Sequence, residues 1–217
     1  MNAPDQGAGS GLRNMSRKSD DVAEYYDDWA DEYDRTLAQW RYEAPEQVAN
    51  RLRAVLAETA TILDAGCGTG LSGKALTRAG FATIDGMDVS RRSLEIAGET
   101  GAYRSLQQVD MQKPPLPYAD DAYDGLACVG VLTYVPDSAG ILREFCRVLK
   151  PGGSMVLTQR DDILEERDFA GTLQQLQDDG FISGFDISVP MSYLPENEEF
   201  SDEVHVHYIT CTVARGR

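Results

Sequence analysis

The stretch TILDAGCGTGLSG, residues 61–73, decides the interpretation of the whole chain. A short apolar run ends in Asp64, and three glycines then follow on alternate positions before an amphipathic segment begins. A strand, a glycine-rich turn and a helix in this order form a corner where backbone and ligand meet closely, because glycine has no side chain. The stretch therefore predicts a cofactor site at the edge of an α/β sheet.

Strand-like and helix-like segments alternate along most of the chain. We expect parallel strands, with amphipathic helices between them, at 61–65, 81–88, 102–110, 122–131 and 151–160. Two further β-rich runs, 181–190 and 204–214, are joined by an acidic loop and predict an antiparallel pair. The expected fold is α/β: a Rossmann-like, doubly wound sheet of seven strands, mostly parallel, with an antiparallel C-terminal edge hairpin.

The start of the chain has a different composition. Residues 1–19 are rich in glycine, serine and asparagine and have little to bury, so we expect a mobile arm. Two amphipathic helices are predicted within 20–58, and the sheet core is predicted over 61–217. Residues 20–217 are therefore expected to form a single domain.

Charge and cysteine spacing limit the partners. The sequence has 20 Lys and Arg residues against 36 Asp and Glu residues, a formal net charge of −16 at pH 7. A surface of this sign repels phosphate backbones and anionic lipid, so we expect no nucleic-acid and no membrane partner. The four cysteines lack CxxC or Cys/His spacing and predict neither a metal site nor a disulfide framework. We expect a cytoplasmic protein, monomeric or weakly homo-oligomeric.

The glycines alone leave two cofactors open. Starting at Gly68, GTGLSG matches the dinucleotide fingerprint, and Asp88 lies about 20 residues on, where a ribose-binding acid belongs. However, that match does not begin directly after the strand, and Asp64 at the strand end repels a pyrophosphate. Asp64, Asp88 and Asp110 instead end three successive strands at one rim of the sheet. A ligand with an ammonium group, a ribose diol and an amino-substituted base suits all three, and S-adenosylmethionine has those groups.

Four successive motifs, taken together, resemble those of the class I S-adenosylmethionine-dependent methyltransferases. The motifs are ILDAGCGTG at 62–70, IDGMDVS at 84–90, QVDMQKPPLPYADDAYDGLACVGVLTYVPD at 108–137 and REFCRVLKPGGSMVLTQRD at 143–161. With YYDDWADEYD at 25–34, the resemblance is closest to the small-molecule branch that includes the Williams–Beuren-region methyltransferase-like proteins. It implies S-adenosylmethionine as the cofactor, S-adenosylhomocysteine as its product, and no metal.

The resemblance also implies a role for each strand-end residue. Asp64 would face the methionine part, and Asp88 would take the two ribose hydroxyls. Val89 would lie beside the adenine, Asp110 would accept a hydrogen bond from its amino group, and Met111 would pack on the ring. From the residues alone, Asp110 is also consistent with a turn-forming acid, and Asp88 with a neighbour of a helix cap.

Two further groups complete the implied cofactor site. The glycine loop and the end of the fourth strand would lie along the methionine and the sulfonium, through Ala65, Gly66, Gly68, Val129 and Gly130. In this family the N-terminal helix folds over the cofactor, so 20–58 would form a helical lid that carries Tyr26, Trp29 and Tyr33. The alternative is that these three rings form only the buried stripe of a helix.

Methyl transfer from a sulfonium needs alignment more than it needs a base, because the donor is already activated. We expect transfer to O, N or S of a small-molecule acceptor, with Tyr134 and Arg160 as the candidate catalytic residues. For Arg160 the alternative is a salt bridge at the rim. His205 and His207 share one face of the last predicted strand, and an edge-strand position favours a packed or solvated pair over a base.

Other functions stay open at this point. Among substrates, protein side chains rank behind small molecules, and RNA ranks last because the chain is acidic. A non-catalytic S-adenosylmethionine-binding module fits the same motifs, because they report cofactor binding rather than turnover. A NAD(P)-dependent oxidoreductase is supported by the fingerprint at Gly68 and opposed by Asp64 and Asp110.

Overall fold

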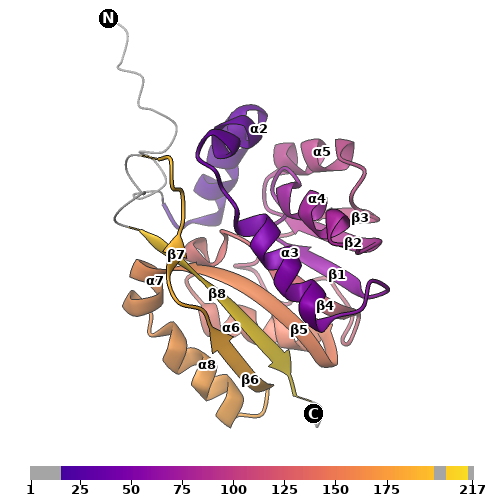
Figure 1. Cartoon of the computed structure of the whole chain (residues 1–217), viewed down its shortest axis with the longest axis vertical. Coiled ribbons are helices and arrows are strands. Elements are labelled where there is room, and N and C mark those ends of the chain that lie inside the picture. Colours follow the sequence, from indigo (N-terminus) through magenta and orange to yellow (C-terminus); the bar gives the residue numbers. More distant parts are fainter. Residues whose placement is uncertain (1–15, 198–203, 215–217) are drawn as a thin grey trace, which may run out of the picture.

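The structure is a computed structural model that describes residues 16–197 and 204–214 (Figure 1). The strands are β1 (Thr61–Ala65), β2 (Thr83–Asp88), β3 (Ser105–Gln108), β4 (Tyr123–Cys128), β5 (Leu149–Arg160), β6 (Ile182–Ile187), β7 (Met191–Ser192) and β8 (His205–Val213). The helices are α2 (Ser19–Gln39), α3 (Ala44–Val55), α4 (Leu71–Arg78), α5 (Arg91–Glu99), α6 (Ser138–Val148), α7 (Asp161–Glu166) and α8 (Phe169–Asp178), with a 3-10 turn, η1, at Leu132–Tyr134.

The strands form one sheet in the order β3-β2-β1-β4-β5-β8-β6, and β7 pairs with β8. Strands β1 to β5 run parallel, whereas β8 is antiparallel to β5 and to β6. This confirms the predicted Rossmann-like α/β class with a mostly parallel sheet and an antiparallel C-terminal pair. The sequence did not reveal the two-residue β7, the short helix α7 or the place of β8 between β5 and β6.

Helices cover both faces of the sheet, and strand β1 shows why its sequence requires this. Ile62 packs with α3 and α4, while its neighbour Leu63 packs with α6 and α8, and both side chains are fully buried. Successive side chains of a strand point to opposite faces, so a continuous apolar run needs a cover on each side. Figure 1 shows α3 crossing one face of the sheet, with α4 beside it.

The strand order also leaves a crevice at one end of the sheet. The chain runs outward from β1 to β2 and β3, then returns to place β4 on the other side of β1. Connections therefore diverge above the carboxyl ends of β1 and β4 and leave a crevice there. Helix α2 lies beyond this rim and contacts α5 (Figure 1).

No helix within 16–197 and 204–214 is long and apolar enough to cross a membrane. Within the same residues, no group of three or more His, Cys, Asp or Glu side chains is arranged to hold a metal ion. Residues 1–15, most of the predicted arm, lie outside the described part of the chain, and α2 begins at Ser19.

Candidate functional site

The glycine loop, residues 65–70, lies tightly between β2 and the segment after β4. The amides of Gly66 and Cys67 both donate to the Met87 carbonyl oxygen, at 2.8 and 2.9 Å. Gly66 has a φ of 81°, and a Cβ atom at this position would lie 2.3 Å from Cγ2 of Val131. A side chain here is excluded both by the left-handed backbone and by the contact, which is why the loop needs glycine at Gly66.

Asp88, at the end of β2, is oriented by backbone amides. Its Oδ2 accepts from Gly68 N at 2.8 Å, and its Oδ1 accepts from Ser90 N at 2.9 Å. Burial raises the pKa of Asp88 above its ordinary value, and these amide hydrogen bonds offset part of that effect. The result is a fixed acceptor on the cavity wall, which suits a ligand that donates hydroxyl protons.

Asp64 lies beneath the loop, and it does not line the cavity. It is fully buried, and its Oδ2 accepts from Ser72 Oγ at 2.6 Å and from the Tyr103 hydroxyl at 2.7 Å. Its Oδ1 has no hydrogen-bond partner within the described residues. Burial raises the pKa of Asp64 to about 6, although both hydroxyl donors act in the opposite direction. A buried carboxylate with one oxygen unused is a position for a cationic or N–H donor.

A second acidic position follows β3. Asp110 pairs with Lys113 Nζ at 3.0 Å, and its Oδ1 accepts from Gln112 N at 2.9 Å. Burial alone would raise the pKa of Asp110, but the hydrogen bonds from Lys113 and from the Gln112 amide bring it below its ordinary value. Met111, next in sequence, is buried in the core of the α6 and α8 face and lines the same cavity.

These residues surround a cavity at the rim of the sheet. Its walls include the sequence-predicted Tyr26, Tyr33, Gly66, Gly68, Asp88, Val89, Asp110, Met111, Val129, Gly130 and Tyr134. The predicted Trp29, Asp64, Ala65 and Arg160 do not line it. Sequence reasoning missed the wall residues Ser19, Val22, Thr69, Ser93, Val109, Gln112, Val131 and Val135. Several of these residues lie within the four motifs, and that position could have identified them.

Aromatic rings of α2 close the cavity from above. The Tyr26 hydroxyl donates to the Tyr134 hydroxyl at 3.3 Å, which joins α2 to η1. Trp29 packs behind the cavity wall, with its ring centroid 4.7 Å from that of Tyr33. Burial raises the pKa of Tyr26, Tyr33 and Tyr134 above the ordinary value, which favours the protonated phenols.

Carboxylates of α2 dock this helix onto the ends of two others. Asp27 Oδ1 accepts from Ser90 Oγ at 2.5 Å and from Arg92 N at 3.0 Å, at the start of α5. Asp34 Oδ2 accepts from Lys74 Nζ at 2.9 Å, on the first turn of α4. Helix N-termini carry partial positive charge, so the acidic character of α2 helps to hold it over the rim.

The cavity is ill suited to a pyrophosphate. None of the described residues on its wall is Lys or Arg, while two of them are Asp88 and Asp110. The amide of Gly68, the first residue of the apparent dinucleotide fingerprint, already donates to Asp88. A phosphate placed here would meet carboxylates instead of free amides.

Comparison with known proteins decides the family. The family model of a methyltransferase domain matches residues 63–157. Human methyltransferase-like protein 27 is 31% identical over 183 residues, which cover 82% of this chain and 73% of that protein. The chain belongs to the class I S-adenosylmethionine-dependent methyltransferases. It is an enzyme of this family, as the motifs predicted.

Other similar proteins include a further methyltransferase and two solved structures with the same fold. Methyltransferase GfsG of Streptomyces halstedii is 35% identical over 121 residues, covering 53% of this chain and 44% of that protein. The solved structure of the cyclase SpnF has a TM-score of 0.70 at 19% identity. The match covers 93% of this chain and 99% of the SpnF chain. The solved structure of an S-adenosylmethionine-dependent methyltransferase from Thermotoga maritima has a TM-score of 0.64 at 19% identity. The match covers 88% of this chain and 98% of the Thermotoga chain. These two structures share the fold.

The two candidate catalytic residues of this methyltransferase occupy different positions. Tyr134 lines the cavity through η1. Arg160, at the end of β5, is buried and does not line the cavity, and its Nε donates to Asp162 Oδ1 at 3.0 Å. The salt bridge considered for Arg160 therefore exists, with Asp162 as its partner. Hydrogen bonding to Asp162 keeps the Arg160 pKa above its ordinary value despite burial.

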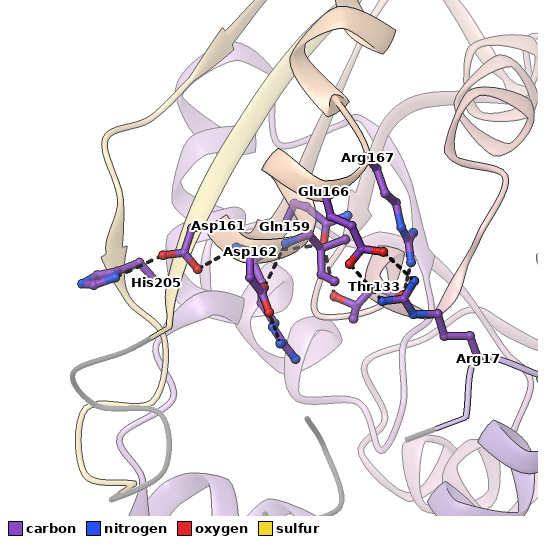
Figure 2. A network of polar contacts seen from close by, with 10 residues as sticks. Arg17, Thr133, Gln159, Asp161, Asp162, Glu166, Arg167 and His205 are labelled. Atoms are coloured by element: carbon purple, nitrogen blue, oxygen red, sulfur yellow. Dashed lines mark hydrogen bonds and ion pairs between the residues drawn. The ribbon is translucent and has the colours of Figure 1, made fainter. Parts of the chain in front are cut away.

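The expectation that the two histidines lie on an edge strand is wrong. Strand β8 lies between β5 and β6, and because it is antiparallel to β5 its first residues reach the same rim as Arg160. There, His205 Nδ1 lies 3.3 Å from Asp161 Oδ2, a contact visible in Figure 2, and His207 Nδ1 lies 2.8 Å from the Ser188 carbonyl oxygen. Both rings have protein partners, and neither lines the cavity.

Proposed function

We propose that this enzyme binds S-adenosylmethionine in the rim cavity and methylates O, N or S of a small-molecule acceptor. The observation that carries the proposal is one apolar cavity with Asp88 and Asp110 on its wall and no Lys or Arg among its described residues. Asp88 would accept from the ribose hydroxyls, and Asp110 from the adenine amino group beside Met111. This arrangement supports a cofactor with a diol, an amine and a cationic centre over a dinucleotide.

The methionine part would lie along the loop at Gly66 and Gly68, with Ala65 behind it. Asp64, buried beneath that loop with its Oδ1 unused, would favour the ammonium group by its negative charge from behind the cavity wall. Val129 and Gly130, on the cavity wall at the end of β4, would lie at the sulfonium. When bound, the cofactor supplies a methyl group that is already activated on sulfur.

The lid helix would exclude water and help to position the acceptor. Tyr26 and Tyr33 form the cover, and Trp29 supports them from behind. Tyr134 accepts a hydrogen bond from Tyr26 and keeps its own proton to donate to an acceptor. Correct alignment of two reactants supplies roughly 7–11 kcal/mol in intramolecular reactions, so displacement at the methyl carbon needs little further assistance. Arg160 would act from behind the cavity wall, by holding the end of β5.

A small acceptor is preferred for two reasons. The net charge of −16 opposes RNA, and the tyrosines of α2 close over the cavity where a bulky protein side chain would enter. We also propose that residues 20–217 act as one catalytic domain with 20–58 as the lid. A cytoplasmic, monomeric or weakly oligomeric protein remains our expectation.

A screen for turnover tests the proposal. The protein is incubated with S-adenosylmethionine and separate panels of phenols, carboxylic acids, amines and thiols, and S-adenosylhomocysteine is quantified by mass spectrometry. Bulk protein and RNA serve as competing substrate classes, and the Asp88→Ala variant serves as the blank. We expect product from a small-molecule panel. Product from RNA or protein alone contradicts the proposal, and cofactor binding without product in any panel favours the binding-module alternative.

A further inference from the structure

The turn after β4, residues 131–135, is held by a side chain from a distant part of the chain. Arg167 directly follows α7, and its guanidinium donates to three carbonyl oxygens of this β4 turn. Nη1 lies 3.0 Å from Leu132 O and 2.8 Å from Val135 O, and Nη2 lies 2.7 Å from Thr133 O. Figure 2 shows Arg167 reaching the turn near Thr133.

A fourth carbonyl of the turn, that of Tyr134, is held from the cavity side. Gln112 Nε2 donates to Tyr134 O at 2.8 Å and also to Arg17 O at 2.8 Å. Leu132 to Val135 thus form four consecutive residues whose carbonyls all accept from side chains. The Thr133 hydroxyl donates in addition to Gln159 Oε1 at 3.1 Å, which joins the turn to β5 (Figure 2).

The β4 turn forms part of the cavity wall, so its position has chemical consequences. Val131, Tyr134 and Val135 line the cavity, and Val131 lies against Gly66 of the glycine loop. The turn follows directly on Gly130. A shift of the turn would therefore move Tyr134 relative to Val129 and Gly130, where we place the methyl group.

The surroundings keep Arg167 in place. Its amide donates to Ile163 O at 3.1 Å, which closes α7, and Ile163 is buried. The neighbouring Glu166 pairs with Arg17 through both carboxylate oxygens, at 3.1 and 3.2 Å, so this acid is engaged by the N-terminal segment and not by Arg167 (Figure 2). The planar guanidinium fork presents several fixed donors at once, which a lysine ammonium does not.

We propose that Arg167 is a positioning residue for methyl transfer: it fixes the β4 turn so that Tyr134 meets the acceptor at the methyl group. This inference rests on the proposed function. Arg167 touches neither cavity nor ligand, and its effect on turnover passes through the backbone of the turn. Its removal takes a donor from three carbonyls, of which Leu132 O keeps a backbone donor, the Val135 amide, and frees the turn to move.

Hydrogen exchange and enzyme kinetics together test whether Arg167 positions the β4 turn. The amides of Tyr134 and Val135 donate to Val131 O and Leu132 O within the turn, so their exchange reports its opening. In Arg167→Met we expect these amides to exchange about tenfold faster, since local opening becomes less costly. With the best acceptor of the screen, kcat should fall by about 100-fold, the loss that misplacement near 1 Å can cause. The dissociation constant for S-adenosylhomocysteine should change by less than about threefold, because no cofactor contact is removed.

Arg147 supplies the matched control. Its guanidinium also donates to backbone carbonyls, those of Leu116 and Tyr118 at 2.9 and 2.8 Å, and neither residue lines the cavity. Arg147→Met should lower the melting temperature at least as much as Arg167→Met while leaving turn exchange and kcat unchanged. Arg167→Lys should restore part of kcat, because lysine retains the charge and some of the donors.

Two results overturn the inference. Turn exchange that is the same in Arg167→Met and wild type would show that the guanidinium does not hold the turn. Equal losses of kcat in Arg167→Met and Arg147→Met would show a general effect on folding. Exchange is measured in the free enzyme and with S-adenosylhomocysteine. If the wild type binds no S-adenosylhomocysteine, the proposed function fails, whereas exchange in the free enzyme still decides whether Arg167 holds the turn.

Discussion

The two sides of the rim cavity are built in different ways. On the side of β1 and β2, the glycine loop and Asp88 are fixed by backbone amides that lie close by, such as Gly68 N and Ser90 N. On the side of β4 and β5, the β4 turn is fixed by side chains from distant parts of the chain, such as Arg167, which is 35 positions away from Leu132. We call these the loop side and the turn side.

The difference matches what each side would do under the proposed function. A cofactor of constant shape is served by a rigid backbone cradle, which strand ends and glycines provide with little help from the rest of the chain. The proposed acceptor would meet a turn whose position depends on side chains from distant parts of the chain. We therefore expect changes on the loop side to alter cofactor affinity, and changes on the turn side to alter turnover.

Removal of the Asp88 carboxylate should produce the largest effect on the loop side. Asp88→Ala deletes two charge-assisted hydrogen bonds to the proposed ribose and the partner of Gly68 N. We expect S-adenosylhomocysteine to bind about 100-fold more weakly, roughly 3 kcal/mol, by calorimetry. Asp124→Ala is the control, since Asp124 also accepts a backbone amide, that of Thr61 at 2.9 Å, but does not line the cavity. Equal losses in both variants would contradict the assignment.

Asp64 should give the loop side a pH-dependent stability. Its pKa is about 6 in the folded protein against 3.8 ordinarily, so the folded state holds this proton more tightly. Stability from this group is present below pH 4 and is lost as the pH rises to 6, by about 3 kcal/mol. In Asp64→Asn this loss should be missing, so the difference in unfolding free energy between the two proteins should change by that amount from pH 4 to pH 7. Urea denaturation at several pH values measures the two unfolding free energies. A difference that stays constant with pH would show that burial does not raise the pKa of Asp64.

Substitution of Gly66 should disturb both sides at once. Gly66→Ala requires a side chain at a φ of 81° and places its Cβ against Val131 of the β4 turn. We expect a loss of about 2 kcal/mol in unfolding free energy together with weaker S-adenosylhomocysteine binding. Gly68→Ala is the control, because its φ of 51° is strained but no atom lies within 4 Å of the added Cβ. If the two variants are equally unstable, the contact between loop and turn is unimportant.

The smallest expected effect lies on the turn side. Tyr134→Phe removes one hydroxyl and its hydrogen bond from Tyr26, and keeps the ring. We expect kcat with the identified acceptor to fall about tenfold, the worth of one neutral hydrogen bond, with little change in cofactor affinity. Steady-state kinetics and calorimetry on the same sample separate the two quantities. A main effect on cofactor affinity would place Tyr134 on the loop side instead.

The sequence predicted the loop side well because its signals are local. The run that ends in Asp64, the glycines behind it and Asp88 lie in two short segments, and strand β1 occupies the predicted 61–65. The parallel order of strands follows from the same alternation, and the comparisons confirm the family.

The turn side was largely hidden from the sequence. Neither α7 nor the role of Arg167 was predicted, because six residues of helix and an arginine after it have no periodicity that stands out. The place of β8 between β5 and β6 depends on long-range pairing, and with it the position of His205 at the rim. Arg160 was named as a candidate, but burial and the pairing with Asp162 became clear only from the structure.

The most direct test of the central claim is calorimetric titration of the wild-type enzyme with S-adenosylhomocysteine and, separately, with NADH. We expect binding of S-adenosylhomocysteine and none of NADH, because the cavity presents Asp88 and Asp110 and no described Lys or Arg to a pyrophosphate. Binding of NADH with no response to S-adenosylhomocysteine would contradict the account and make the fingerprint at Gly68 the true signal.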